Sequence, residues 1–76
     1  MNNVRRTSLR SIMEQIEDLK SSLEELLDEE QDYLDNMPEN LQGSERYERA
    51  EEAISAMEDA ISNLEDAVDN IDTAIE

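Results

Sequence analysis

The chain has 76 residues, of which 22 are acidic and six are basic, so its net charge is −16, and 37% of its residues are hydrophobic. It contains one glycine, one proline, no cysteine and no histidine, which excludes disulfides, thiolate metal sites and histidine-based catalysis and argues against a β-sandwich or barrel. No apolar run approaches the roughly 18 residues of a membrane span, and the first ten residues lack the apolar stretch of a secretory signal, so we expect a cytoplasmic protein without membrane contact.

The first predicted helix covers about residues 8–36 and follows a short basic arm, residues 1–7. Ser11 and Glu14 fit a capping box at its start, and alternative caps lie one turn earlier. Its apolar residues alternate spacings of three and four, which is typical of a coiled-coil seam. One acidic residue, Glu30, interrupts the seam, whose other members are Leu9, Ile12, Ile16, Leu19, Leu23, Leu26, Tyr33 and Met37.

The second predicted helix covers about residues 45–75 and follows a turn at about 37–43. Pro38 disfavours helix at the residue before it, Gly43 permits a positive φ, and Ser44 is a good N-cap. The same alternating spacing continues through Tyr47, Ala50, Ile54, Met57, Ile61, Leu64, Val68, Ile71 and Ile75.

Two helices of similar length joined by a short turn predict an all-α fold, an antiparallel two-helix coiled-coil hairpin. A register in which paired residue numbers sum to 80 closes with this turn. It places Leu19 against Ile61 in a central layer and Glu30 opposite the small Ala50. We expect Glu30 to lie near the turn, with an arginine of the second helix in reach.

Two further apolar columns widen the seam and would stay partly exposed on a lone hairpin. On the second helix alanine repeats every seven residues, and on the first helix three large apolar residues line one flank, interrupted by Lys20. We expect both columns to contact a second copy in a homodimeric helical bundle, the alternative being the helix of another partner. The predicted oligomerisation residues are Met13, Leu27, Leu34, Ala53, Ala60, Ala67 and Ala74.

The basic residues gather at the start of the chain, where Arg5, Arg6 and Arg10 all precede residue 11. In a hairpin the start of the first helix lies beside the end of the second. We therefore expect exposed pairing of these arginines with the last acids of the chain, which are Asp66, Asp69, Asp72 and Glu76.

The sequence offers no catalytic or metal-binding constellation. Lys20 is adjacent to Ser21 and Ser22, but neighbouring residues on a helix do not face each other. The acidic stretch from Asp28 to Asp35 lacks the glycine and the ligand spacing of a calcium loop. We expect a non-enzymatic protein with no metal and no cofactor.

The acidic surface predicts a basic protein partner. The acids lie along a rod of about 45 Å at about one per 2 Å, close to the one charge per about 1.7 Å of duplex DNA. The chain would then occupy a basic nucleic-acid-binding surface in place of DNA, without binding nucleic acid itself. The candidate contact residues are Asp28, Asp32, Asp35, Glu51, Glu58, Glu65 and Asp72.

An alternative function uses the apolar residues instead. On that interpretation the chain is a structural or adaptor protein that acts through homo-oligomerisation and its apolar flanks, and the acids only keep its surface solvated.

The segment from Tyr33 to Glu48, with the turn Pro-Glu-Asn-Leu-Gln-Gly-Ser-Glu-Arg-Tyr-Glu, resembles small acidic helical-hairpin proteins of phages and mobile elements of Gram-positive bacteria. The resemblance extends over the flanking Glu-rich and Ala-rich heptads and carries over no functional residues. It implies a phage setting, in which small acidic proteins inhibit host nucleic-acid enzymes such as restriction and CRISPR effectors. The expected function is thus an anti-CRISPR-type inhibitor that acts as a DNA mimic in the host cytoplasm.

Overall fold

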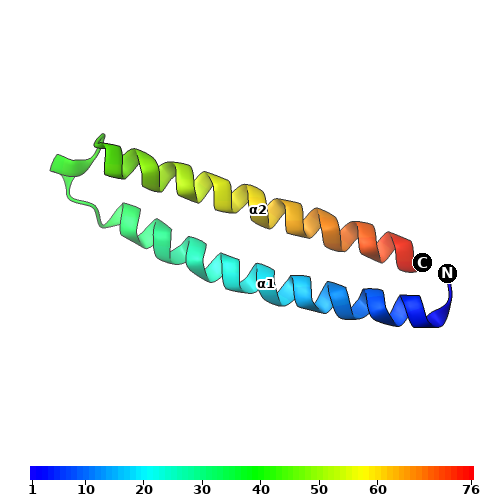
Figure 1. Ribbon diagram of the computed structural model, residues 1–76. Coiled ribbons are helices and arrows are strands. Elements are labelled where there is room, and N and C mark those ends of the chain that lie inside the picture. The colour runs from blue at the N-terminus through cyan, green and yellow to red at the C-terminus, as the bar shows by residue number, and fades with distance from the viewer.

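The computed structural model describes residues 1–76 as an antiparallel helical hairpin (Figure 1). Helix α1 spans Asn3–Asp35, a short 3-10 helix η1 spans Glu39–Leu41, and α2 spans Glu45–Ile75. Both termini lie together at the end opposite the turn (Figure 1). The backbone forms a rod of 60 × 15 × 12 Å. The predicted all-α hairpin is confirmed, and neither helix offers a segment that could cross a bilayer.

Helix α1 begins earlier than its predicted start at residue 8. Its N-cap is Asn2, whose side-chain oxygen accepts a hydrogen bond from the backbone N–H of Arg5 at 2.8 Å. Asparagine is among the best N-caps, and arginine is a good helix former. The residues predicted as a basic arm, 1–7, therefore form the first turns of α1 from Asn3 onward.

The turn follows the signals in the sequence. Helix α1 ends at Asp35 and is followed by its C-cap, Asn36, whose side-chain amide donates to the carbonyl of Asp32 at 2.8 Å. Gly43 has a φ of 84°, a left-handed conformation that favours glycine. The hydroxyl of Ser44 accepts a hydrogen bond from the backbone N–H of Tyr47 at 3.3 Å, which caps α2 as predicted.

The buried core is small and lies at the turn end. Only Met37, Ala50 and Ile54 are buried, and the rest of the interhelical contact is half-buried. A compact protein of this mass exposes about 4,800 Å². The chain exposes 5628 Å², so the hairpin leaves more surface in water than a globular domain of equal size.

Helix α1 is rotated about its axis relative to the predicted seam. The prediction that Ile12, Leu19, Leu26 and Tyr33 lie between the helices is wrong, because these side chains are 45%, 64%, 55% and 47% exposed. The predicted contact of Leu19 with Ile61 is lost with it, and Ile61 instead shares a hollow with Leu27. The half-buried positions of α1 are Arg6, Leu9, Met13, Ile16, Lys20, Leu23, Leu27, Glu30, Gln31 and Leu34.

The rotation has a physical reason in the wide apolar face of α2. This face has three columns, each made of residues that are seven apart in the sequence. The half-buried alanines Ala53, Ala60 and Ala67 form the column on one side of the central column. Helix α1 packs along the middle of the face, so that it partly covers all three columns. It meets α2 with the column of Met13 and leaves the column of Leu19 in water.

Candidate binding surfaces

The hairpin has two long flanks, one on each side of the contact between α1 and α2. Two hollows, each lined by residues of both helices, show which columns of α1 and α2 lie on the same flank. Tyr33 and Arg46 line one hollow together at the turn end. Leu27 lines another with Ile61 and Glu65, in the middle of the rod. Residues seven apart lie above one another on a helix in a coiled-coil arrangement, so each hollow identifies a pair of adjoining columns along the whole rod.

The first flank is acidic, and we call it the acid flank. It lies on both sides of Lys20 and Leu27 and consists of Glu17, Glu24, Asp28 and Asp35 on α1 and Glu51, Glu58, Glu65 and Asp72 on α2. Four of these acids, Glu24, Asp28, Glu58 and Glu65, surround a hollow of about 340 Å³ that also contacts Leu27 and Ile61. No group of acids on the chain is arranged to hold a metal ion.

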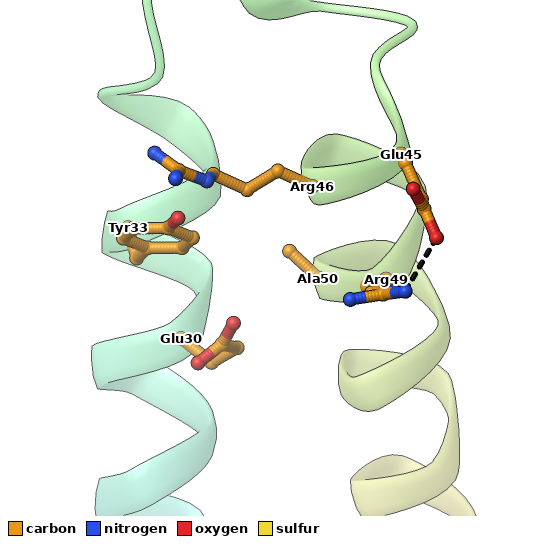
Figure 2. Close-up of a pocket in the computed structure, with 6 residues that line it drawn as sticks. All are labelled: Glu30, Tyr33, Glu45, Arg46, Arg49 and Ala50. Atoms are coloured by element: carbon orange, nitrogen blue, oxygen red, sulfur yellow. Dashed lines mark hydrogen bonds and ion pairs between the residues drawn. The ribbon is translucent and has the colours of Figure 1, made fainter.

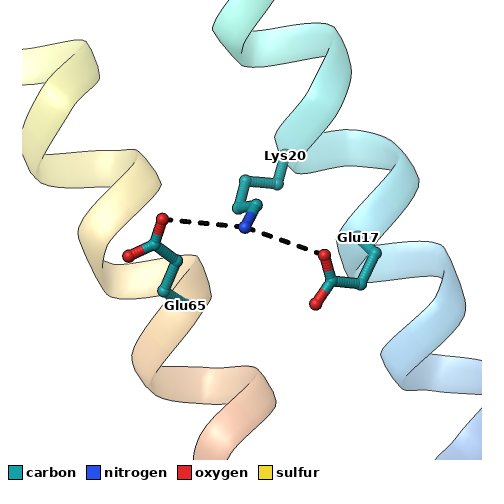
Figure 3. A network of polar contacts seen from close by, with 3 residues as sticks. All are labelled: Glu17, Lys20 and Glu65. Atoms are coloured by element: carbon teal, nitrogen blue, oxygen red, sulfur yellow. Dashed lines mark ion pairs between the residues drawn. The ribbon is translucent and has the colours of Figure 1, made fainter.

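Lys20 is the one cation that bridges carboxylates across the acid flank (Figure 3). Its ammonium nitrogen lies 3.6 Å from a carboxylate oxygen of Glu65 on α2 and 3.7 Å from one of Glu17 on its own helix. The lysine side chain is 20% exposed, whereas both glutamates are more than half exposed. Its aliphatic stem thus fills the gap in the apolar column while the charge stays at the surface.

The structure brings six of the seven predicted partner-binding acids to the acid flank. These six are Asp28, Asp35, Glu51, Glu58, Glu65 and Asp72. The seventh, Asp32, lies apart from them and lines a hollow near the turn with Tyr33 and Pro38. Sequence reasoning missed Glu17 and Glu24, although their spacing from Asp28 on the heptad could have identified them.

The opposite flank is nearly free of acids, and we call it the neutral flank. Its centre consists of Arg5, Ile12, Leu19, Leu26 and Tyr33 on α1 and Arg46, Ala53, Ala60, Ala67 and Ala74 on α2. Its edges are Ser8, Gln15, Ser22 and Glu29 on α1 and Arg49, Ala56, Asn63 and Asn70 on α2. These positions include one acid, Glu29, and three arginines, and two further acids, Glu30 and Glu45, border them at the turn end, in a chain with a net charge of −16.

The turn end of the neutral flank contains a hollow of about 370 Å³ (Figure 2). Arg46 extends from α2 towards α1 beside Tyr33, and Arg49 pairs with Glu45 on its own helix (Figure 2). Glu30 lines the same hollow opposite Ala50, as the sequence predicts. Both arginines line the hollow with Glu30, but neither forms an ion pair with it, and the half-buried carboxylate keeps access to water.

The predicted oligomerisation residues divide between the two flanks. The alanine column is on the neutral flank, where Ala53, Ala60 and Ala67 are half-buried and Ala74 is exposed. Met13, Leu27 and Leu34 border the acid flank and are half-buried against α2 within one chain. A single hairpin therefore already covers much of the second group.

The N-terminal arginines make a different contact from the one predicted. The Arg6 side chain donates from Nε to the backbone carbonyl of Ile75 at 3.0 Å. None of the ion pairs in the structure joins Arg5, Arg6 or Arg10 to a carboxylate. The last carbonyls of a helix lack intrahelical donors and carry partial negative charge, so Arg6 satisfies the end of α2 directly.

No protein-family model matches the chain, and neither do any curated proteins or solved structures. Its function is therefore inferred from the two flanks themselves.

Proposed function

We propose that the chain is a non-enzymatic acidic binding protein that uses the acid flank to occupy a basic nucleic-acid-binding surface. The target class that fits best is a host defence enzyme that binds DNA, such as a restriction or CRISPR effector. This would make the chain a phage-type, cytoplasmic inhibitor that mimics DNA. The resemblance of its turn to small acidic phage proteins supports the phage setting.

The observation that carries this proposal is the alignment of acids along one side of a rigid rod. Four acids of α2 repeat every seven residues and face acids of α1 across a shallow hollow. The 22 acids of the chain are distributed over 60 Å, which is about one per 2.7 Å against one per about 1.7 Å for duplex DNA. This spacing is wider than the sequence predicts, since the 60 Å length includes the turn as well as the helices. It counts the acids on every face of the rod, and it is within a factor of two of DNA.

The proposal is tested by displacement of DNA from purified restriction and CRISPR nucleases. Fluorescence anisotropy of a labelled duplex bound to each enzyme should fall as the chain is added. Neutralising Glu51, Glu58 and Glu65 to glutamine and Asp72 to asparagine should remove the displacement. The helices should stay intact, because all four residues are exposed.

A variant of equal net charge provides the control. Glu25, Glu29, Glu39 and Glu52 lie off the acid flank, and their change to glutamine removes the same four charges. This control should still displace DNA. If both variants lose activity equally, only net charge matters, and if no nuclease releases its DNA to the wild-type chain, the proposal is wrong.

We also propose that the chain functions as a homodimer. The support is the small core, since only three residues are buried and most of the apolar seam remains half-exposed. A second copy would supply the burial that one hairpin lacks. Sedimentation equilibrium tests this, and a mass of one chain at every concentration would contradict it.

A further inference from the structure

We propose that the neutral flank is the docking surface for a second copy of this chain, with both turns at the same end of the dimer. This inference rests on the homodimer proposed above and assigns it a surface and an arrangement.

Charge is the first argument. Two bodies of net charge −16 repel each other, and a contact between acid flanks would place rows of carboxylates face to face. The neutral flank has three acids, Glu29, Glu30 and Glu45, all near the turn, and they are matched in number by its three arginines, so two copies can meet there with little local repulsion. The acid flanks then lie on opposite sides of the dimer, exposed to a basic partner.

Exposed apolar surface is the second argument. The large side chains Ile12, Leu19, Leu26 and Tyr33 form a stripe along α1 on this flank, and each is 45% to 64% exposed. Single exposed apolar residues are ordinary on protein surfaces, but a contiguous stripe marks an interaction site. Glu29 and Glu30 are the only acids beside the stripe, between Leu26 and Tyr33, so no acid interrupts it from Ile12 to Leu26, which is unexpected for a face that stays in water.

Area decides in favour of a whole second chain over a short peptide. The hairpin exposes 5628 Å², roughly 800 Å² more than a compact protein of its mass. A standard protein interface removes about 800 Å² from each partner. This excess belongs to the whole chain and is similar in size to what one partner contributes to a stable dimer, and the flank runs the length of the 60 Å rod, which a short peptide would not cover.

Side-chain size determines the arrangement. On the neutral flank α1 presents large residues and α2 presents alanines. A two-fold axis along the rod places α1 of each copy on α2 of the other, so that Leu19 packs on Ala60 and Leu26 on Ala53 of the second chain. In the opposite arrangement, with the turns at opposite ends, α1 would meet α1 and α2 would meet α2. The large residues of α1 would then hold the two alanine columns apart and leave a void between them.

The surface is tested by sedimentation equilibrium of three proteins, with helicity followed by far-UV circular dichroism. The wild-type chain should have the mass of a dimer. Changing Leu19 and Leu26 together to glutamine should give a helical monomer. The control, Asp18→Gln with Glu25→Gln, alters two exposed residues of the same helix that lie on neither flank, and it should stay dimeric. A dimeric Leu19→Gln/Leu26→Gln variant would overturn this surface while leaving self-association intact.

Disulfide trapping gives a second readout that does not depend on the folding of that variant. The chain has no cysteine, so single cysteines can be placed freely. Leu19→Cys mixed with Ala60→Cys should form a crosslinked heterodimer on mild oxidation, and Ser21→Cys mixed with Ala60→Cys should not. Equal crosslinking in both mixtures, or none in either, would overturn the proposal, and homodimers of Leu19→Cys alone would overturn the same-end arrangement.

The experiments distinguish a failure of the dimer proposal from a failure of the inhibitor proposal. A wild-type chain that is monomeric at high concentration in both low and high salt would overturn both the dimer and its surface. Displacement of DNA by the acid flank is measured independently, and a monomer that still displaces DNA would leave the acidic binding function in place.

Discussion

The two flanks of the hairpin have the same backbone and the same length but opposite chemistry. The acid flank carries eight carboxylates around Lys20, whereas the neutral flank has acids only near the turn, Glu29, Glu30 and Glu45, beside a stripe of exposed apolar residues. A net charge of −16 would be compatible with acids on every exposed face. Their scarcity on one side is the basis on which we propose different roles for the two flanks, so the distribution of charge says more here than its sum.

Salt should give the strongest test of the difference between the flanks. It should weaken binding through the acid flank and strengthen self-association through the neutral flank. If carboxylates replace about six phosphates, affinity for a basic target should fall on the order of 10³-fold between about 50 and 200 mM salt. Self-association through the neutral flank should strengthen over the same range, because salt screens repulsion beyond about 10 Å. Isothermal calorimetry and sedimentation measure the two effects. The same direction for both would mean that the flanks do not have separate roles.

The next largest effect is expected from truncating one apolar residue in the core and comparing the loss of stability with that of a truncation on the neutral flank. Ile54 is 7% exposed, so Ile54→Ala should cost about 2–4 kcal/mol of unfolding free energy. Leu19 is 64% exposed in one chain, so Leu19→Ala should cost under about 1 kcal/mol in dilute monomer. Urea unfolding at several protein concentrations measures both. The loss of unfolding free energy caused by Leu19→Ala should increase with protein concentration. A large loss at high dilution would show that Leu19 lies in the interhelical seam.

A smaller effect is expected at the turn, on which both flanks depend, since it folds α2 back onto α1. Ser44→Ala removes the N-cap hydrogen bond to Tyr47 and should destabilise the hairpin by about 1 kcal/mol. Ser55 is exposed within α2, and Ser55→Ala should leave stability unchanged or raise it by a few tenths of a kcal/mol. Thermal unfolding of the two variants checks this difference, and equal stability would show that Ser44 does not cap α2.

The smallest change in stability is expected at Lys20. Its ion pairs with Glu17 and Glu65 have exposed acidic partners, so Lys20→Gln should cost less than about 1 kcal/mol. The variant also removes the cation at the centre of the acid flank, and it should bind a basic target more tightly than the wild type. Weaker binding by Lys20→Gln would show that the basic target does not approach across this part of the flank.

Much of the fold follows from the sequence because local signals agree. The apolar spacing predicts two helices, Pro38 and Gly43 predict the turn, and Ser44 predicts the start of α2. The rotation of α1 could not be predicted in the same way. The columns of Ile12 and Met13 lie on either side of the column of Leu9, and both are mostly apolar. Only the width of the face on α2 decides between them, and that is a property of the packed pair.

The binding surfaces could be predicted in part for the same reason. Four of the predicted acids share one heptad column, Glu51, Glu58, Glu65 and Asp72, and they stay together whatever the rotation. The neutral flank combines columns from both helices, so it becomes visible only once their relative rotation is known. Asp32 shows the limit, since its closeness to Asp28 in sequence does not place it on the same side of the rod.

The separation of roles between the flanks is tested most directly by hydroxyl-radical footprinting of the wild-type chain over a range of concentrations. Leu19, Leu26 and Tyr33 on the neutral flank should react more slowly as the concentration rises, because a second copy covers them. Met13 and Leu34, which border the acid flank, should keep a constant rate and serve as internal references. Constant rates at Leu19 and Leu26, or equal protection of Met13, would contradict the assignment of the second copy to the neutral flank.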